Sequence, residues 1–441
     1  MKISIIGTGY VGLVTGVCLA EKGHDVTCVD MDAGKVARIN EGISPIFELG
    51  LDDLLERNIG RKLRATTNLT DAVQNTDLTF IAVGTPFDGA TIDLTAVLQA
   101  ASEIGQALKH KSAYHVVVVK STVVPGTTDG AVLQALEAAS GRKAGSDFGL
   151  GMNPEFLSEG EAVNDFMTPD RIVLGGIDER AIAAMEAIYL PFDGDVPRLK
   201  TNTRTAEMIK YASNALLATL ISFSNEMANL GAALGGIDTV DVMRGVHLSQ
   251  YFRGRTADNL PPITSFLRAG CGFGGSCLPK DVKALIAHGQ RTGVKMDVLK
   301  AVIDVNQNQP GKIIDLIRKH RADLRGMRVA VLGLSFKPDT NDVRESPAFP
   351  IIRRLLAEGV EVRAYDPVAI DDAKRAFDNP DVTYSTSMAS ALDNVEAAIV
   401  VTPWREFEAL PELLGGKQVL LVDARRAFDK HRYAHYEGIG L

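Results

Sequence analysis

Residues 1–12 read MKISIIGTGYVG, and this stretch decides how the first part of the chain folds. An apolar run typical of a buried strand leads into Gly7, Gly9 and Gly12, which have the G-x-G-x-x-G spacing. Such glycines allow a tight turn between a strand and a helix, and let a ligand approach the backbone closely. Asp30 closes the next apolar run, where an acidic side chain can accept hydrogen bonds from a ribose. Strand, glycines, helix and acidic residue together predict a dinucleotide-binding turn.

The carboxylate of Asp30 also distinguishes between two dinucleotides. It would repel a 2′-phosphate, so the sequence favours NAD over NADP. The alternative is a glycine turn that binds no ligand, and that alternative leaves Asp30 unexplained.

Short apolar runs alternate with helical patterns in two parts of the chain. Near-continuous apolar runs are typical of strands buried on both faces of a parallel sheet. In the first part the predicted strands are Lys2–Gly7, Asp25–Asp30, Leu78–Val83, His115–Lys120, Phe148–Met152 and Arg171–Gly175. In the last part they are Arg328–Gly333, Glu361–Tyr365, Ala397–Val401 and Gln418–Val422.

Between these parts the apolar spacing changes to steps of three and four from about Thr201, which predicts one long helix ending near Gly235 and Gly236. We therefore expect an α/β protein with two Rossmann-like, doubly wound parallel-sheet domains joined by a helical middle domain. The expected boundaries are 1–200, 201–310 and 311–441. The long helix has more apolar surface than one small domain needs, so we expect it also to meet a second subunit.

The bulk composition narrows the class of protein. The 441 residues carry a formal net charge of -8, which disfavours a broad nucleic-acid-binding face. No apolar run has the length of a membrane span, and the N-terminal residues form a strand pattern rather than a signal peptide. The four cysteines form no C-x-x-C pair, so we expect reduced thiols and a cytoplasmic protein.

The segment 272–281, GFGGSCLPKD, is the strongest indication of chemistry. Glycines around Cys277 allow close backbone approach, and Lys280 and backbone donors favour a thiolate. A cysteine is more often a small buried apolar residue, and we interpret Cys18, Cys28 and Cys271 in that way. A nucleophilic thiol beside NAD indicates that an aldehyde is oxidised further, through a thiohemiacetal and a thioester, to an acid.

Several polar residues are candidates for the same site. Lys210 and Asn214 share one helical face and can hold an oxyanion. Glu155 and Glu159 follow one predicted strand, and Ser121 with Thr122 follows another. Taken singly, each has a structural interpretation, such as a solvated helix residue, a cap or a turn former; their joint placement favours a site. In the last part of the chain, the loop after the predicted strand Arg328–Gly333 contains Lys337 but lacks the three glycines of a dinucleotide-binding turn. A lysine in this place suits a phosphate group, so a phosphorylated ligand fits better than a second dinucleotide.

With these motifs, the chain resembles the UDP-glucose/GDP-mannose dehydrogenase family over nearly its whole length. The matching motifs are Gly7–Gly12, Val83–Pro86, Lys120–Val123, Asn153–Gly160, Pro169–Val173, Glu207–Asn214, Gly272–Asp281 and Phe336–Ser346. The resemblance implies a four-electron oxidation of the C6 hydroxymethyl group of a nucleotide-hexose to a carboxylate, with two NAD used in succession. It also implies a homodimer or larger homo-oligomer with the long helix at the interface.

The resemblance further implies a role for individual residues. Cys277 is the implied nucleophile, and Lys210 with Asn214 stabilises the oxyanion. Asp281 and Glu155 handle protons and water, and Thr122 positions water or substrate. The implied NAD-binding residues are Gly7, Gly9, Tyr10, Val11, Gly12, Asp30, Lys35, Thr85, Pro86, Ser121, Thr122, Glu159, Lys280 and Arg344. The implied substrate-binding residues are Glu155, Phe156, Leu157, Lys210, Asn214, Arg255, Phe266, Leu267, Arg268, Gly272, Phe273, Phe336, Lys337 and Arg425. No metal site is implied.

One segment departs from the family pattern. Residues 245–270 are longer than the short Arg-Ile-Gly segment of related UDP-glucose enzymes. The motif Pro169–Val173 favours the UDP-glucose branch, but GDP-mannose or another UDP-hexose stays open. Two further alternatives are a two-electron hydroxyacid dehydrogenase, in which Cys277 would have no task, and a catalytically silent NAD-binding regulator.

Overall fold

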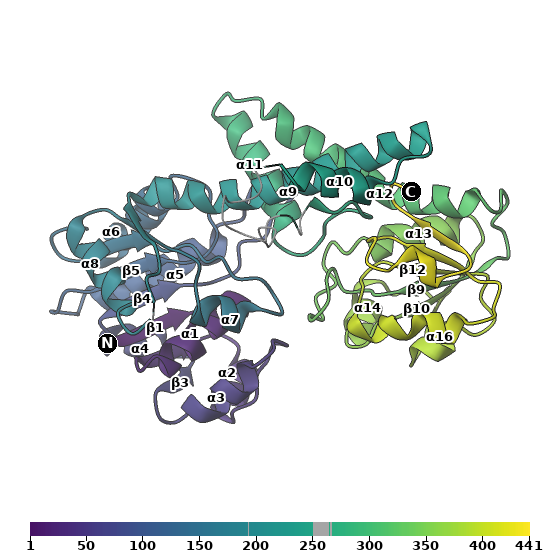
Figure 1. Ribbon diagram of the computed structural model, residues 1–441. Helices are drawn as coiled ribbons and strands as arrows, with labels where there is room; N and C mark the ends of the chain where they lie inside the picture. The colour runs from purple at the N-terminus through teal and green to yellow at the C-terminus, as the bar shows by residue number, and fades with distance from the viewer. Residues whose placement is uncertain (193, 250–263, 265–266) are drawn as a thin grey trace. The chain divides into compact units, whose positions relative to one another are not determined.

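The computed structural model describes residues 1–192, 194–249, 264 and 267–441. The chain divides into two compact units, Met1–Ser213 and Asn214–Leu441. Each unit contains one sheet with helices on both faces (Figure 1). The predicted α/β class with two predominantly parallel sheets is therefore confirmed.

Unit 1 contains an eight-stranded sheet in the order β3-β2-β1-β4-β5-β6-β7-β8. Its strands are β1 (Lys2–Ile6), β2 (Asp25–Val29), β3 (Leu63–Thr66), β4 (Leu78–Ile81), β5 (Val116–Val119), β6 (Gly149–Met152), β7 (Ile172–Gly176) and β8 (Arg198–Thr201). Its helices are α1 (Tyr10–Glu21), α2 (Ala33–Asn40), α3 (Leu51–Asn58), α4 (Leu69–Gln74), α5 (Thr95–Leu108), η1 (Thr128–Val132), α6 (Leu133–Ser140), α7 (Ala162–Met167) and α8 (Glu179–Ile188). All neighbouring strands pair in parallel except β6 and β7, which are antiparallel.

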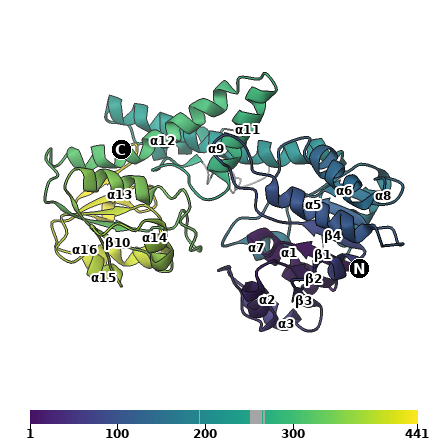
Figure 2. The ribbon, with the colours of Figure 1, turned by 180° about the vertical axis from the view of Figure 1, so that it is seen from behind.

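Two apolar cores form because the central strands are buried on both faces. Side chains of α1, α3, α7 and α8 pack on one face of the sheet, and those of α4, α5 and α6 pack on the other. The four valines of β5 are all buried, which explains why this strand is an unbroken apolar run in the sequence. The helices α2 and α3 lie next to β3 in both views (Figure 1 and Figure 2).

Unit 2 repeats the same strand order over six strands, β11-β10-β9-β12-β13-β14. Its strands are β9 (Arg328–Leu332), β10 (Glu361–Tyr365), β11 (Val382–Tyr384), β12 (Ala397–Val400), β13 (Leu420–Asp423) and β14 (Tyr436–Gly438), all parallel. Its helices include α10 (Thr239–His247), α11 (Leu278–Arg291), α12 (Asp297–Arg318), α13 (Ala348–Ala357), α14 (Ile370–Ala376), α15 (Met388–Ala391) and α16 (Leu410–Leu414). The ridge of apolar side chains on α12 and α13 covers one face, and α15 and α16 cover the other.

The predicted long helix is α9, which spans Thr203–Leu234 and ends directly before Gly235 and Gly236. Both glycines have positive φ, a conformation that stops a helix at low cost when the side chain is absent. The boundary between the two units falls within α9, after Ser213. The boundaries at residues 200 and 310 stay a prediction.

The four strands that the sequence did not reveal are β3, β8, β11 and β14, and each lies at an edge of its sheet. Edge strands are partly exposed, so they lack the continuous apolar run that marks central strands. The exposure pattern of β8 has no buried residue at all. The sequence therefore does not predict these strands, because their exposed residues interrupt the apolar run.

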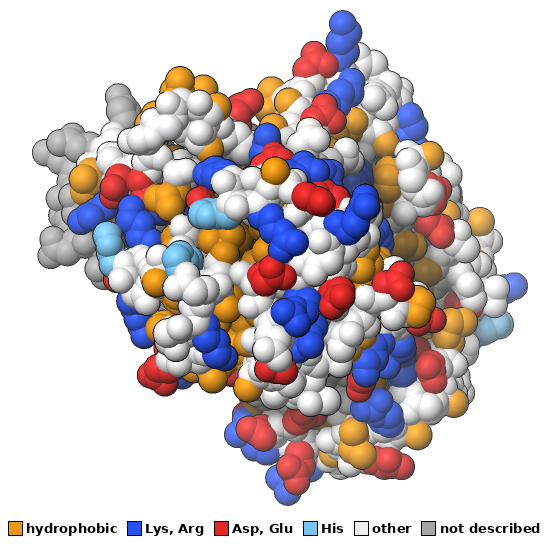
Figure 3. Space-filling model, turned by 90° about the vertical axis from the view of Figure 1, so that its right-hand side faces the viewer, with side chains coloured by type: hydrophobic (Ala, Val, Ile, Leu, Met, Phe, Trp, Pro, Cys, Tyr) orange, Lys and Arg blue, Asp and Glu red, His pale blue; other side chains and the backbone are white. Residues whose placement is uncertain are grey.

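The surface carries both signs of charge. On the face drawn in Figure 3, Lys and Arg side chains are interspersed with Asp and Glu. Among the described residues, no helix combines the length and apolar character that a membrane span requires.

Candidate active site

The glycine turn lies between the end of β1 and the start of α1. Gly7 has φ +100°, and a Cβ there would lie 2.8 Å from the carbonyl oxygen of Ala82. A Cβ on Gly12 would lie 1.9 Å from the carbonyl oxygen of Gly7. The fold itself therefore requires these two glycines. A Cβ on Gly9 would meet no atom of the chain within 4 Å, so the space in front of Gly9, at a helix N-terminus, fits a pyrophosphate.

Asp30 is held against this turn. Its Oδ2 accepts hydrogen bonds from the backbone N–H and the hydroxyl of Thr8 at 2.9 and 2.6 Å, and its Oδ1 accepts one from the N–H of Asp32 at 3.0 Å. Burial raises the pKa of Asp30, but these hydrogen bonds and the nearby Lys35 cation outweigh it, and the pKa lies below its usual value. An ionised carboxylate in this place fits ribose hydroxyls and opposes a 2′-phosphate.

The loops after β4 and β5 meet at the same sheet edge as the glycine turn. The hydroxyl of Thr85 donates to the carbonyl oxygen of Thr122 at 2.9 Å, and the hydroxyl of Ser121 donates to that of Val83 at 2.7 Å. Pro86 is exposed beside Thr85. Ligands of open α/β sheets bind beyond the carboxyl ends of the strands, so these residues lie where a nicotinamide cofactor would extend.

Glu155 and Lys210 form a buried ion pair in unit 1. Glu155 follows β6, Lys210 lies on α9, and Nζ is 2.8 Å from Oε1. The N–H of Leu157 donates to the other carboxylate oxygen at 2.7 Å. Burial raises the pKa of Glu155, but the Lys210 charge and both hydrogen bonds outweigh it, so its pKa lies below the usual value. Glu155 is therefore equipped to accept a proton rather than to donate one.

Aromatic and charged groups surround this pair. The Lys210 Nζ lies 5.6 Å from the ring centroid of Phe156, and the Arg171 guanidinium lies 3.8 Å from the same centroid. Leu157 and Glu159 are partly exposed on the same loop. Unit 1 thus brings together Glu155, Phe156, Leu157 and Lys210.

Lys120 is a second buried cation near Glu155, and our sequence analysis gave it no role. Its Nζ donates to Oδ1 of Asn153 at 3.0 Å and lies over the rings of Phe80 and Phe166. Burial lowers the pKa of Lys120 to about 8, although the Glu155 charge acts in the opposite direction. The available signal was a lysine placed directly after four buried valines.

Glu48 is another residue that the sequence analysis missed. Its carboxylate accepts hydrogen bonds from the Tyr10 hydroxyl, from the N–H of Gly160 at 2.6 Å and from the N–H of Ala162 at 2.8 Å. It therefore links the start of α1 to the loop that carries Glu159. No local pattern around Glu48 predicts these contacts, because its partners lie far away in the sequence.

In unit 2, Cys277 is the N-cap residue of α11, and its thiol is exposed. The other three cysteines are free and buried, as predicted. The N-terminal end of a helix favours a negative charge, which suits a thiolate. The N–H of Asp281 donates to the carbonyl oxygen of Cys277 at 2.8 Å, so the carboxylate lies one turn after the thiol.

Asp281 is 1% exposed and has two side-chain partners. Lys280 Nζ lies 2.5 Å from Oδ1, and Asn214 Nδ2 donates to Oδ2 at 2.6 Å. Lys210 and Asn214, which the sequence placed on one helical face, therefore contact different carboxylates. Lys210 pairs with Glu155 and Asn214 with Asp281.

The glycine-rich loop before Cys277 packs against the loop after β9. The Phe336 ring lies so close to Gly275 that a Cβ there would be 2.8 Å from it. Arg425 donates to the carbonyl oxygens of Gly272 at 2.7 Å and Val401 at 3.0 Å. Phe273 is buried, and Lys337 is partly exposed next to Phe336. We call residues 272–277 the thiol loop. Unit 2 thus brings Phe336, Lys337 and Arg425 close to this loop, which itself contains Gly272 and Phe273.

The loop after β9 has a counterpart of Asp30. Asp366 follows β10 and accepts hydrogen bonds from the N–H groups of Leu334 and Ser335 at 2.8 and 3.0 Å. It is fully buried and also accepts from the indole N–H of Trp404 at 3.1 Å. This carboxylate is enclosed by the protein, so it supports the turn and is not presented to a ribose. An aspartate directly after the second strand of the unit was the signal for it.

Of the remaining predicted residues, Arg344 lies against the glycine-rich loop before Cys277, because its carbonyl oxygen accepts from the N–H of Gly275 at 2.9 Å. Leu267 and Arg268 line a cavity of about 720 Å³ beside α10. Arg344 is exposed and pairs with Asp342 at 2.7 Å. Arg255 and Phe266 lie outside the described residues.

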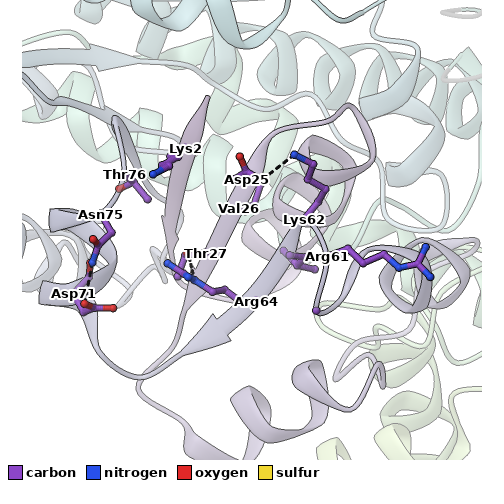
Figure 4. Close-up of a pocket in the computed structure, with 12 residues that line it drawn as sticks. Lys2, Asp25, Val26, Thr27, Arg61, Lys62, Arg64, Asp71, Asn75 and Thr76 are labelled. Carbon is purple, nitrogen blue, oxygen red and sulfur yellow. Dashed lines mark hydrogen bonds and ion pairs between the residues drawn. The ribbon is translucent and has the colours of Figure 1, made fainter.

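A second cavity lies in unit 1, away from the glycine turn. It has a volume of about 540 Å³ and is lined by the first residues of β1, β2 and β3 (Figure 4). Lys62 pairs with Asp25 there, at 2.9 Å. Because the strands start at this edge, the cavity lies at the opposite end of the sheet from Gly9, and it is not the cleft expected for a dinucleotide.

Comparisons with known proteins agree with this division of features. The models of the UDP-glucose/GDP-mannose dehydrogenase family match the NAD binding domain at residues 1–193, the central domain at 204–308 and the UDP binding domain at 330–430. The chain is 44% identical to UDP-glucose 6-dehydrogenase AglM of Haloferax volcanii over 100% of both chains. It is 41% identical to UDP-glucose 6-dehydrogenase TuaD of Bacillus subtilis, over 97% of this chain and 89% of the relative.

A solved structure gives the same result in three dimensions. The UDP-glucose dehydrogenase of Pyrobaculum islandicum has a TM-score of 0.90 and 40% identity, with 99% of this chain and 97% of that chain covered. The relatives match the chain over nearly its whole length, and the solved structure shares its fold. This chain belongs to the UDP-glucose/GDP-mannose dehydrogenase family.

Proposed function

We propose that this chain oxidises the C6 hydroxymethyl group of UDP-glucose to a carboxylate, with NAD as the oxidant, and so forms UDP-glucuronate. The observation that carries the proposal is the single exposed thiol, Cys277, at the start of the helix whose buried Asp281 contacts Asn214 and the partly exposed Lys280. The relatives named UDP-glucose 6-dehydrogenase, which are similar over the whole chain, support the choice of sugar.

The chemistry balances with two NAD for each sugar. Bound NAD supplies the hydride acceptor. The first oxidation removes a proton and a hydride from the C6 alcohol and leaves an aldehyde. The Cys277 thiol adds to the aldehyde as a thiohemiacetal, loss of a second proton and hydride leaves a thioester, and water releases the acid and the free thiol. Cys277 belongs to unit 2, and the glycine turn belongs to unit 1.

The roles of the surrounding residues follow from their charge state and contacts. Glu155 is held as a carboxylate, which suits it to accept a proton from the water that cleaves the thioester. Lys210 and the Asn214 amide supply positive charge and an N–H donor for a developing oxyanion. Asp281 takes part in proton transfer, and Thr122 orients water or substrate. Gly9, Asp30, Lys35, Thr85 and Ser121 hold the cofactor.

The nucleotide part of the substrate belongs to unit 2. Phe336 and Phe273 offer aromatic surface, and Lys337, Arg268 and Arg425 offer positive charge for a diphosphate. The division of the chain into a cofactor domain (1–200), a helical domain (201–310) and a nucleotide-sugar domain (311–441) is part of the proposal. The separate family models matched to the three segments support it.

We also propose that two chains pair through α9. Leu216, Phe223 and Leu230 recur every seven residues, so they share one helical face, and they are 53%, 48% and 53% exposed. We refer to these three side chains as the apolar stripe, and such a row can be self-complementary in a two-fold dimer. The occupant of the stripe is therefore a second copy of this chain.

A reducing compartment suits this chemistry. Cys277 must stay a thiol to act, and none of the four cysteines forms a disulfide. Disulfides are rare in the cytosol, where thiols are kept reduced. We therefore assign the enzyme to the cytoplasm.

The stoichiometry of NADH tests the proposed function. The full chain is incubated with excess NAD and a limiting amount of UDP-glucose, and NADH is followed by absorbance. Two NADH for each UDP-glucose support the four-electron reaction; one NADH supports the two-electron alternative, and none contradicts both. The same assay with UDP-galactose, a UDP-N-acetylhexosamine and GDP-mannose decides which nucleotide-hexose is used.

A further inference from the structure

The loop that precedes Cys277 has no regular secondary structure and is held by hydrogen bonds to buried side chains and to the backbone of neighbouring segments. The N–H of Gly270 donates to Oδ1 of Asn225 at 2.7 Å, and its carbonyl oxygen accepts from Nε2 of Gln309 at 2.8 Å. The N–H of Cys271 donates to the carbonyl oxygen of Ala424 at 2.9 Å. Asn225 and Gln309 are fully buried, so the start of the loop is tied to α9 and α12.

Asn306 holds Phe273, four residues before the thiol, and the N–H of Gly275, two residues before it, donates to the carbonyl oxygen of Arg344 at 2.9 Å. The Oδ1 of Asn306 accepts from the N–H of Phe273 at 2.7 Å, and its Nδ2 donates to the carbonyl oxygen of Phe273 at 3.0 Å. One carboxamide thus satisfies both polar groups of one backbone residue, in the manner of a paired strand. This bidentate contact fixes the position and the orientation of the peptide units on either side of Phe273.

The neighbouring sequence fits this contact. Gly272 has φ +101°, and a Cβ there would lie 2.7 Å from Oδ1 of Asn306, so only glycine leaves room for the carboxamide. Asn306 and Gln309 lie three apart on α12 and therefore share a face. The contact is built into both elements rather than made by a mobile surface side chain.

We propose that Asn306 is a positioning residue for the Cys277 thiol. The proposal rests on the proposed function, in which Cys277 is the nucleophile. Asn306 acts through Phe273, which stands four residues before the thiol and is itself a proposed substrate contact. When the clamp is lost, the loop samples several conformations and the thiol misses the aldehyde. The first oxidation needs no thiol, so the second oxidation suffers more.

The test compares Asn306→Ala with Asn308→Ala in the full chain. Asn308 is exposed on the same helix, and its amide donates to the carbonyl oxygen of Asp304 at 2.9 Å. We expect Asn306→Ala to lower kcat about 10- to 100-fold, with the KM for NAD nearly unchanged. We also expect fewer than two NADH for each UDP-glucose consumed, with aldehyde captured by an added hydroxylamine. Asn308→Ala should behave as the unaltered chain.

Asn306→Asp keeps the shape of the side chain and the acceptor for the Phe273 N–H, but it replaces the donor with a charged oxygen. It therefore distinguishes a loss of the bidentate hydrogen bonds to Phe273 from a loss of packing. If the alanine variant does not fold, Asn306→Asp alone tests whether these hydrogen bonds position the thiol. Wild-type kcat and NADH yield in Asn306→Asp and in a folded Asn306→Ala overturn the proposal.

Hydrogen exchange tests the clamp without reference to the substrate. We expect the amides of residues 272–277 to exchange about tenfold faster in Asn306→Ala than in Asn308→Ala. Equal exchange rates overturn the proposal whichever sugar is used. If the unaltered chain makes no NADH from UDP-glucose while exchange is faster in Asn306→Ala, the proposed function fails and the clamp on the loop stands.

Discussion

The Lys210 ammonium lies 2.8 Å from the Glu155 carboxylate, and both side chains are almost completely buried. An ion pair enclosed in this way is costly to form and still more costly to break, because the group left behind has no solvent to neutralise its charge. The cation of Lys120 lies close enough to influence Glu155 as well. One carboxylate therefore balances two buried cations.

Glu155→Gln keeps the size of the side chain but removes the negative charge that neutralises Lys210 and Lys120. We expect the free energy of unfolding to fall by about 3 kcal/mol and kcat by about 100-fold. Glu186→Gln is the control, since Glu186 pairs with Lys200 at the surface and its loss should cost under about 1 kcal/mol. Urea unfolding and NADH formation give the two quantities. Equal losses in the free energy of unfolding would show that the buried ion pair contributes no more to stability than the surface pair.

In the unaltered chain, acid should remove the stabilisation that ionised Glu155 contributes to the free energy of unfolding. The pKa of Glu155 lies below its usual value in the folded protein, so its stabilisation is present above the unfolded pKa and is lost as pH falls through the folded one.

Lys120 predicts a pH dependence of the same sign in the alkaline range. Burial lowers its pKa from the usual 10.5 to about 8, so between these values the unfolded chain binds more protons and the free energy of unfolding rises with pH. The full rise corresponds to about 3 kcal/mol. Lys120→Met should flatten this part of the curve, measured by urea unfolding from pH 7 to 10.5, whereas a Lys143→Met control, altered at an exposed ion pair, should keep it. If the free energy of unfolding of Lys120→Met rises with pH as steeply as that of the unaltered chain, the rise does not come from Lys120.

Two glycine variants separate the needs of the fold from those of the cofactor. Gly12→Ala places a methyl group against the carbonyl oxygen of Gly7, so we expect loss of the folded protein or a much lower Tm. Gly9→Ala meets no atom of the chain, so we expect a normal Tm but NAD affinity reduced by about tenfold or more. Calorimetric titration with NAD measures the affinity. Normal NAD binding by Gly9→Ala would move the pyrophosphate away from this turn.

Replacing the thiol should stop the reaction between its two oxidations. We expect Cys277→Ser to stall after the first oxidation, or to stop as a slowly hydrolysed ester, with steady acid formation reduced by about 1,000-fold or more. Cys18→Ala, at a buried thiol in unit 1, should keep both oxidations. NADH bursts and mass spectrometry of the protein distinguish the two stalled states. Full steady turnover in Cys277→Ser would remove this residue from the role of nucleophile.

The apolar stripe on α9 predicts the state of assembly. Phe223→Asp puts a charge at the centre of the stripe, and we expect sedimentation to show a lower mass than for the unaltered chain. Leu190→Asp is the matched control, because Leu190 is 68% exposed in unit 1 and lies off the stripe. Its mass should equal that of the unaltered chain. A Phe223→Asp variant with unchanged mass would place the interface elsewhere.

Much of the fold and part of the site could be predicted because the signals are local. A buried central strand is a run of apolar residues, a glycine turn is a spacing of three glycines, and the thiol loop lies within a single decapeptide. Each is complete within about a dozen residues, so β1, β5 and β10 were recognisable from their own sequence, and the apolar steps of three and four along Thr203–Leu234 identified α9. The edge strands β3, β8, β11 and β14 were not, because their exposed faces remove the pattern.

What tertiary structure alone decided is which polar groups meet. Sequence order placed Lys210 and Asn214 on one helical face, yet their partners are Glu155 and Asp281, far away along the chain. The same holds for Asn306 and Phe273, 33 residues apart, and for Glu48 and Gly160, 112 residues apart. Apolar periodicity specifies the elements because burial acts on each one separately. A hydrogen bond or an ion pair depends on two atoms meeting within about 3 Å, and only the folded path of the chain brings such atoms together.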